Sequence, residues 1–174
     1  MTLNGDTTYT DSGKFGRALL LDGAGDYVQS AFAPFDPSTT DFTGECWVNL
    51  DTLANGNDQD IIQQRNSDLG GTGRTWVYLN DATDKLSSYL GGSETTSTFT
   101  PTVGTWHHVA VVVTQGTGAD TIKIYADGSL VGSSNNKNVE PTSGEMMFGA
   151  NKNLAYGAFV KGRIDECRVW SKAC

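Results

Sequence analysis

The sequence predicts an all-β fold, a two-sheet antiparallel β-sandwich with almost no helix. Short apolar or alternating segments recur along the whole chain, and turns rich in Gly, Asn and Asp separate them. No segment of about ten or more residues carries an apolar stripe at helical spacing. The length of 174 residues suits one core, so we expect a single domain over residues 1–174.

The centre of the predicted sandwich is residues 105–131. At 107–113 apolar or small side chains occupy both alternating faces, which is typical of a strand inside a sandwich. A glycine-rich loop and a second strand follow, and this strand closes on Asp127-Gly128, a strong hairpin signal. We therefore expect a buried central strand pair.

The other elements follow from the same alternation and turn signals. In the expected strand 42–50, Trp47 lies on one face, and the other face carries Phe42, Gly44, Cys46, Val48 and Leu50. Pro34 and Pro37 predict an irregular crossing, because proline cannot donate to a ladder. We expect residues 1–14 to form a peripheral start and residues 132–144 a polar loop. The remaining strands are expected at 15–21, 27–29, 61–64, 75–79, 85–90, 146–149 and 159–170.

Charge and composition exclude several partners. The formal net charge is −8 with a pI near 4.5, so the surface repels nucleic acid phosphates. No window approaches the roughly 18 apolar residues that span a bilayer, and we expect no membrane insertion. The start, MTLNGDTTYT, lacks the features of a signal peptide, so we interpret the chain as a domain cut from a larger parent protein.

Three cysteines occupy positions 46, 167 and 174. Cys46 and Cys167 lie in apolar strand segments, where a free thiol behaves as a small hydrophobic group. We expect buried thiols, and a disulfide is the alternative.

Five phrases together resemble the laminin-G-like jelly roll of the concanavalin A-like lectin/glucanase superfamily. They occur in the family's order over nearly the whole chain: GKFGRALLLDGAGDYV, FTGECWVNL, GTWHHVAVVV, IKIYADGSLVGS and KGRIDECRVWSKA. The resemblance implies two antiparallel sheets packed face to face, one of them concave. Members of the superfamily bind glycans or proteins, accompany hydrolases or act as hydrolases, so the fold does not select a function.

The acidic and histidine residues of the sequence do not have the spacing of a catalytic site. The resembled glucanases carry spaced carboxylates, whereas Asp165 and Glu166 are adjacent and point to opposite faces of a strand. His107 and His108 are also adjacent, so they point to opposite faces of a strand and do not chelate one metal together. We expect no enzyme activity.

Aromatic and amide side chains are the candidate ligand contacts. Trp76 and Tyr78 share one face of an expected strand, and Tyr89 lies on its hairpin partner. They form a sugar platform if this face is exposed and a core if it is not, while we place Trp47 and Trp106 in the core. Three residues of one loop complete the candidate set: Asn151, Asn153 and Tyr156.

Acidic turns favour a bound calcium ion, which prefers several carboxylate and carbonyl oxygens. We expect Asp22 and Asp26, with Asp165, to form a structural site, and Asp58 and Asp60 a ligand-linked one. Resemblance to pentraxins implies a second acidic loop, but residues 149–153 carry a lysine there. The alternative is that these residues only form turns.

The sequence therefore favours a non-catalytic recognition module, a carbohydrate-binding or adhesion domain. Its expected partner is a glycan or protein ligand on a cell or matrix surface, and its expected location is extracellular, on a cell surface or on a virion. A protein-binding or structural spacer domain is the first alternative, and an atypical glycoside hydrolase the second.

Overall fold

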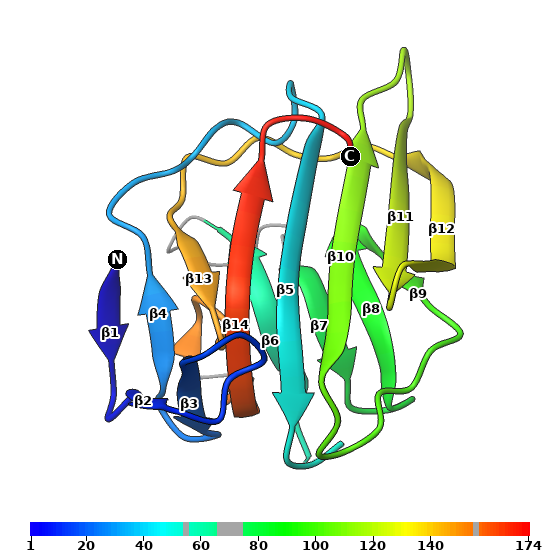
Figure 1. The fold of residues 1–174 in the computed structure, drawn as a ribbon. Helices are drawn as coiled ribbons and strands as arrows, with labels where there is room; N and C mark the ends of the chain where they lie inside the picture. The colour runs from blue at the N-terminus through cyan, green and yellow to red at the C-terminus, as the bar shows by residue number, and fades with distance from the viewer. Residues whose placement is uncertain (54–55, 66–74, 155–156) are drawn as a thin grey trace.

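Two antiparallel sheets of seven strands each pack face to face in a computed structural model (Figure 1). The structure describes residues 1–53, 56–65, 75–154 and 157–174. The all-β sandwich expected from the sequence is confirmed, and this described part contains no α-helix. It therefore also contains no helix long and apolar enough to cross a membrane.

The two sheets are called the front and back sheets after their positions in Figure 1. In spatial order the front sheet contains β12 (Ser129–Lys137), β11 (Asp120–Ala126), β10 (His107–Thr114), β5 (Phe42–Leu50), β14 (Lys161–Trp170), β3 (Ala18–Asp22) and β2 (Thr8–Thr10). The back sheet contains β1 (Thr2–Asn4), β4 (Tyr27–Gln29), β13 (Met146–Phe148), β6 (Gln59–Gln64), β7 (Thr75–Asn80), β8 (Lys85–Leu90) and β9 (Ser93–Thr96).

Strands β1 and β2 lie in the segment expected as a peripheral start, most of β12 lies in a segment expected as a polar loop, and no strand was expected at β9. All four are at sheet edges. Their residues are mostly exposed and polar, because an edge strand has little apolar surface to bury. Apolar alternation therefore does not detect them.

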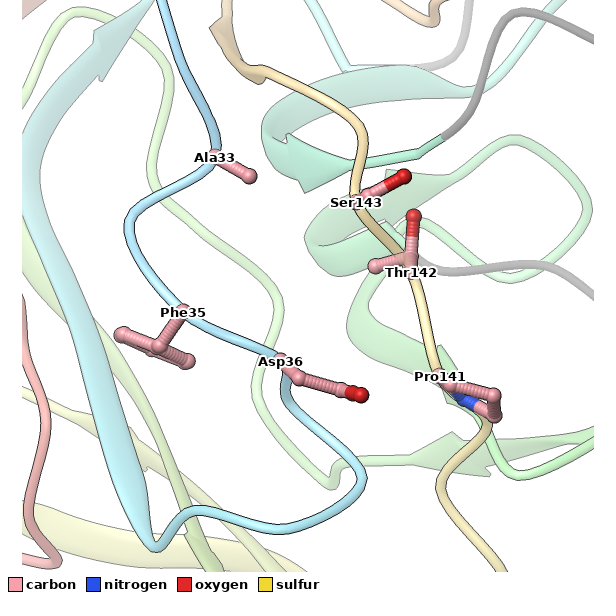
Figure 2. A pocket seen from close by; sticks show the side chains of 6 residues that line it. All are labelled: Ala33, Phe35, Asp36, Pro141, Thr142 and Ser143. Atoms are coloured by element: carbon pink, nitrogen blue, oxygen red, sulfur yellow. The ribbon is translucent and has the colours of Figure 1, made fainter.

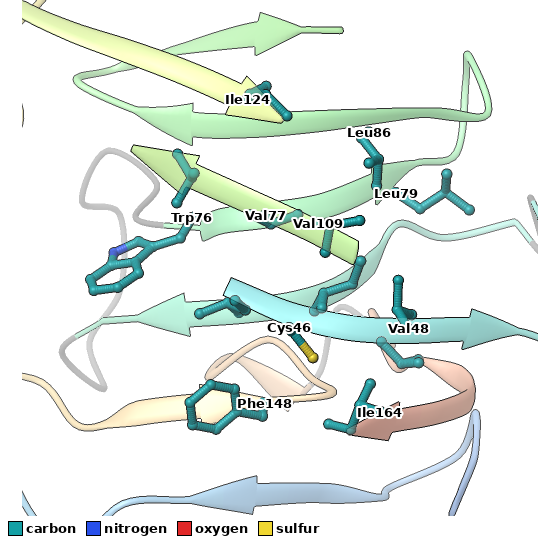
Figure 3. Packing of buried hydrophobic residues seen from close by; sticks show 14 of the residues in the cluster. Cys46, Val48, Trp76, Val77, Leu79, Leu86, Val109, Ile124, Phe148 and Ile164 are labelled. Carbon is teal, nitrogen blue, oxygen red and sulfur yellow. The ribbon is translucent and has the colours of Figure 1, made fainter. Parts of the chain in front are cut away.

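The core lies between the sheets, and Figure 3 shows part of it. The strand predicted at 42–50 is confirmed as β5, and its alternate residues from Phe42 to Leu50 face inward. Val109, Val111 and Val113 of β10 are fully buried beside them.

Trp47 and Trp106 are half-buried, so their predicted core positions are wrong. Trp47 lies on the outer face of the front sheet, where it makes a T-shaped contact with Phe15 with the ring centroids 5.8 Å apart. The ammonium group of Lys14 lies 4.2 Å from the centroid of the Trp47 ring. The segment before β3, which crosses this face in Figure 1, partly covers Trp47 without making it core.

Matching β-bulges in β6 and β7 decide which side chains face outward. In β7, the register moves three residues from Thr75 to Tyr78 while the partner strand moves two. Trp76 and Val77 are therefore both in the core, and Thr75 and Tyr78 share the outer face. A bulge adds one residue to a strand and changes the phase of its alternation.

A bulge changes the alternation of β6 in the same way, so that Ile61 and Ile62 both face the core. Asp60 and Gln63, on either side of that apolar pair, face outward beside Tyr78 and Thr75. Two bulges thus place four polar side chains on one patch of the back sheet.

Cys46 and Cys167 lie side by side in neighbouring strands of the front sheet, with their sulfur atoms 2.7 Å apart. The pairing of β14 with β5 is irregular between Asp165 and Arg168, and Glu166 has a φ of 50°. This bulge turns Cys167 toward Cys46. Burial raises the pKa of the Cys46 thiol, and the neighbouring thiol raises it further. Both cysteines are free thiols in the structure, and Cys174 is exposed.

Candidate functional site

A buried polar cluster lies on the outer face of the back sheet. It consists of Asp60, Gln63, Thr75 and Asn151. The Asp60 Oδ2 atom accepts hydrogen bonds from Asn151 Nδ2 at 2.7 Å, from Gln63 Nε2 at 3.1 Å and from Thr75 Oγ1 at 3.1 Å. Gln63 Nε2 also donates to Thr75 Oγ1 at 3.0 Å. The cluster ties β6, β7 and the segment after β13 together.

The segment after β13 covers this cluster through main-chain as well as side-chain contacts. The main-chain N–H of Lys152 donates to Gln63 Oε1, and that of Asn153 donates to Asn151 Oδ1 at 2.9 Å. Arg65 Nη1 donates to the same Asn151 oxygen at 3.4 Å. Lys152 itself pairs with Glu145 at 3.1 Å. Two of the predicted ligand residues, Asn151 and Asn153, thus order this loop.

Asp60 has an unusual protonation equilibrium. Burial raises its pKa to about 7, and the hydrogen bonds from Asn151 and Thr75 offset part of that rise. Charge is costly to bury without compensation. Near neutral pH the cluster therefore holds a carboxyl group that is ionised in only part of the molecules.

The predicted aromatic platform is not formed. Trp76 is 0% exposed and packs against Phe42, with ring centroids 4.3 Å apart, so it cannot stack on a ligand. Tyr78 faces outward but is 5% exposed. Burial and the neighbouring Glu94 raise its pKa. The bulge in β7 is the physical reason that Trp76 and Tyr78 face opposite sides.

Tyr89 is the half-buried aromatic residue that remains on this outer face, directly opposite Thr75. Its hydroxyl donates to the main-chain oxygen of Gly92 at 3.3 Å. Tyr156, the last predicted ligand residue, lies outside the described residues.

Asp58 and Asp60 are not brought together as metal ligands. Asp58 Oδ1 accepts the main-chain N–H of Asp81 at 2.8 Å and so supports the turn after β7. Burial raises the pKa of Asp58, and that hydrogen bond offsets part of the rise. The Asp60 oxygen is occupied by three donors. The donor set therefore does not fit the pentraxin-type calcium site considered from the sequence.

Asp22 and Asp26 lie close together, but Asp165 is not with them. In the pairing of β14 with β3, Asp22 is opposite Lys161, and Asp165 lies four residues further along β14. Asp165 Oδ2 accepts the main-chain N–H of Phe15 at 2.9 Å, and its Oδ1 accepts that of Glu166 at 2.8 Å. The expectation that Asp165 completes this site is wrong, because the strand separates it from the turn.

The two histidines make separate contacts. His107 Nε2 accepts the main-chain N–H of Thr102 at 3.1 Å, so its Nδ1 carries the proton that Asp127 Oδ2 accepts at 2.7 Å. This pair lowers the pKa of Asp127 against the opposing effect of burial. His108 faces Glu45 at 3.2 Å. His107 thus connects the start of β10 to the turn after β11, and His108 connects β10 to β5.

An open pocket of about 440 Å³ lies between two irregular segments (Figure 2). Ala33, Phe35 and Asp36 form one wall, and Pro141, Thr142 and Ser143 form the other. The Asp36 carboxylate points across the gap toward Pro141, and the Phe35 ring turns away from it (Figure 2).

The pocket wall is anchored in the core. The ring of Phe35 stacks on Trp76, with centroids 5.9 Å apart. Its main-chain oxygen accepts a hydrogen bond from Gln64 Nε2 at 2.9 Å. Gln64 follows Gln63, so one strand connects the pocket to the polar cluster. Trp76, predicted as a ligand contact, instead supports this wall.

The sequence did not indicate the residues that line this pocket. The signal available was the pair of prolines at 34 and 37, which predicted an irregular crossing, opposite the second irregular segment at 132–144. Nothing in the sequence pairs these two segments, because about a hundred residues separate them and their contact depends on the stacking of the sheets.

A second pocket, of about 190 Å³, is lined by residues of both sheets, such as Leu19 and Val28, and in part by Asp165, Glu166 and Arg17. Both carboxylates there are engaged, since Asp165 accepts main-chain N–H groups and Glu166 pairs with Arg168. The two acids predicted to be non-catalytic thus make structural contacts.

Comparison with known proteins identifies the fold. Residues 22–174 match the family model Laminin_G_3, described as the concanavalin A-like lectin/glucanases superfamily. No match was found among curated proteins.

Solved structures share the architecture at low identity. Domain 4 of AbnA, a GH43 extracellular arabinanase from Geobacillus stearothermophilus in complex with arabinotriose, has a TM-score of 0.66 and 22% identity; the alignment covers 97% of this chain and 77% of that one. Mouse laminin alpha1 domains LG4-5 have a TM-score of 0.62 and 15% identity, and the alignment covers 90% of this chain and 43% of that one. The Ruminococcus gnavus IT-sialidase CBM40 bound to alpha2,3 sialyllactose has a TM-score of 0.60 and 11% identity, and the alignment covers 85% of this chain and 91% of that one. The chain spans less than half of the laminin fragment.

Proposed function

The chain belongs to the concanavalin A-like lectin/glucanases superfamily, and we propose that it is a non-catalytic module that binds carbohydrate in the pocket between residues 33–36 and 141–143. Two of the similar structures are complexes with arabinotriose and sialyllactose. Similar folds carry other functions, so the proposal depends on the pocket of this chain.

The observation that carries the proposal is the chemistry of the pocket lining. Asp36 supplies a carboxylate that accepts hydrogen bonds from sugar hydroxyls, and Thr142 and Ser143 supply hydroxyl groups. Ala33 and Pro141 add small apolar surfaces for the C–H faces of a sugar ring. Few polar groups on a largely preformed wall are typical of a ligand site.

The lining supports binding rather than hydrolysis. A retaining glycosidase needs two carboxyl groups about 5 Å apart across the scissile bond. Among the described residues that line this pocket, Asp36 is the single carboxylate. Its Oδ1 atom accepts two hydrogen bonds from Ser38, at 2.9 Å and 2.8 Å, which hold it in place.

Binding of a protein is the second candidate function. Phe32 is 71% exposed and directly precedes the pocket wall. An exposed aromatic ring suits a protein interface, and laminin domains are among the similar structures. In either case we place the module in a larger secreted, cell-surface or virion protein.

A glycan array, followed by titration calorimetry with the best glycan, tests the carbohydrate proposal. Ser143→Trp fills the pocket from its exposed edge and is expected to weaken binding at least tenfold. Ser133→Trp, at an exposed position of edge strand β12, is the matched control and leaves the affinity unchanged. Equal affinity of both variants, or no binding to any glycan, contradicts the proposal.

A further inference from the structure

Two turns cross between the sheets at the same end of the sandwich, and both carry aspartates. The first turn joins β1 to β2 and contains Asp6. The second joins β3 to β4, with Asp22 at its start and Asp26 at its end. One carboxylate oxygen from each of the three lies within 4.8 Å of the others.

Asp26 is the buried member of this acidic group, at 2% exposure. Its Oδ2 atom accepts the main-chain N–H of Asp22 at 3.0 Å. Its Oδ1 atom is buried and has no hydrogen-bond partner. That oxygen faces the first turn, since a Cβ atom on Gly5 would lie 2.5 Å from it. An unpaired buried carboxylate oxygen is costly and needs a partner.

The neighbouring carboxyl group of Asp6 supplies that partner only when a proton is shared between the two acids, because an ionised carboxylate has no proton to donate. Asp22 Oδ1 accepts the main-chain N–H of Ala24 at 2.7 Å, which closes the turn. Burial raises the pKa of Asp26, and the adjacent carboxyl groups of Asp6 and Asp22 raise it further. Within the described residues, no ion pair joins any of the three to a lysine or arginine, although Lys161 is opposite Asp22 in the strand pairing.

We propose that Asp6, Asp22 and Asp26 bind a calcium ion that joins the two turns. A cation at this position gives Asp26 Oδ1 its missing partner and removes the repulsion among three carboxylates. Three protein carboxylates in glycine-containing turns, with water completing the shell, suit the flexible coordination of Ca²⁺ better than the rigid octahedron of Mg²⁺.

The ion connects the ends of the two sheets. Asp6 follows β1 of the back sheet and precedes β2 of the front sheet, while Asp22 ends β3 of the front sheet and Asp26 precedes β4 of the back sheet. Binding to the folded state alone stabilises it by mass action. This site is distinct from the pocket, so the two proposals fail independently.

Thermal unfolding of the full chain in CaCl2, MgCl2 and EGTA tests the site. At ~10 mM CaCl2, about a hundred times a dissociation constant of about 10⁻⁴ M, the midpoint is expected to rise by roughly 5–10 °C over EGTA. MgCl2 is expected to produce a clearly smaller rise. Titration calorimetry with CaCl2 alone gives the stoichiometry, expected to be one ion per chain.

Asp6→Ala is the decisive variant, because Asp6 is exposed and its loss removes a ligand without opening the core. It is expected to abolish most of the calcium-dependent rise. Asp11→Asn removes one exposed charge of the same N-terminal segment, which pairs with Arg17, and is expected to retain the full rise.

Three results overturn the proposal. They are an unchanged midpoint in CaCl2 with no heat of binding, an equal calcium effect in Asp6→Ala and Asp11→Asn, or an equal effect of MgCl2. If calcium has no effect and acidification from pH 7 to pH 5 stabilises the wild type more than Asp6→Ala, Asp26 shares a proton with Asp6 instead of a metal.

Discussion

Asp60 and Asp26 are both aspartates at 2% exposure, yet their surroundings differ in one respect. One Asp60 oxygen accepts three hydrogen bonds from side chains of β6, β7 and the segment after β13. Asp26 has one oxygen bound to a main-chain N–H, while the other faces a second turn without a partner.

Burial alone therefore does not identify a ligand site. The Asp60 cluster contains its own donors, so it holds strands and a loop together without a further component. The acidic group around Asp26 contains acceptors only and is incomplete without a cation or a proton. The supply of donors separates the two.

Trp76→Ala tests the core packing beneath the polar cluster, and we expect it to have the largest effect on the free energy of unfolding. The ring is fully buried between Phe35 and Phe42, so its loss is expected to cost about 3–5 kcal/mol of unfolding free energy. Urea denaturation measures it. Tyr89→Ala on the outer face, as control, is expected to cost much less. Equal costs would contradict the phase change that the bulge imposes.

Asp60→Ala tests whether the cluster depends on its acceptor. Three donors, two of them from buried residues, lose the carboxylate that accepts their hydrogen bonds, and we expect a cost of about 3 kcal/mol by urea denaturation. Asp60→Asn keeps one carbonyl oxygen and is expected to cost less. Asp11→Ala, at the surface, is the reference and is expected to change stability by less than about 0.5 kcal/mol. A cost for Asp60→Ala near this reference would show that the donors find water instead.

The pH dependence of stability reports the protonation of Asp60. Its folded pKa of about 7 exceeds the usual value of 3.8, so its contribution is complete below the unfolded pKa and is lost as pH rises through the folded pKa. Between pH 5 and pH 8, wild type is expected to lose about 2 kcal/mol more than Asp60→Asn. Parallel pH profiles of the two proteins would contradict the raised pKa.

Asp26 is expected to make stability fall with rising pH as Asp60 does, but by less. Calcium is expected to separate the two residues, because it binds only near Asp26. In EGTA its raised pKa makes the folded state more stable at low pH, and this contribution is lost as pH rises. Calcium competes with protons for the carboxylates, so its stabilising effect is expected to grow with pH. Midpoints measured in CaCl2 and EGTA across pH test this. An effect of calcium that does not vary with pH would argue against carboxylate ligands.

Much of the fold could be predicted from local sequence. The strands with apolar alternation, such as β5 and β10, were expected within a residue or two, since burial between two sheets requires that pattern. The Asp22–Asp26 turn was also identified as a candidate metal site, because acidic residues and glycine are adjacent in sequence there.

The partners of these residues were decided by tertiary structure. Asp6 joins Asp22 and Asp26 only because β1 and β4 pair in one sheet and β2 and β3 in the other. The bulges that turn Trp76 inward and Thr75 outward arise from strand registers, not from residue type. Local propensities and alternation by themselves determined that this chain folds as a two-sheet sandwich, because those forces act over a few residues. Which side chains meet at the pocket, the polar cluster and the acidic turns depended on long-range pairing, which the packing of the whole core selects.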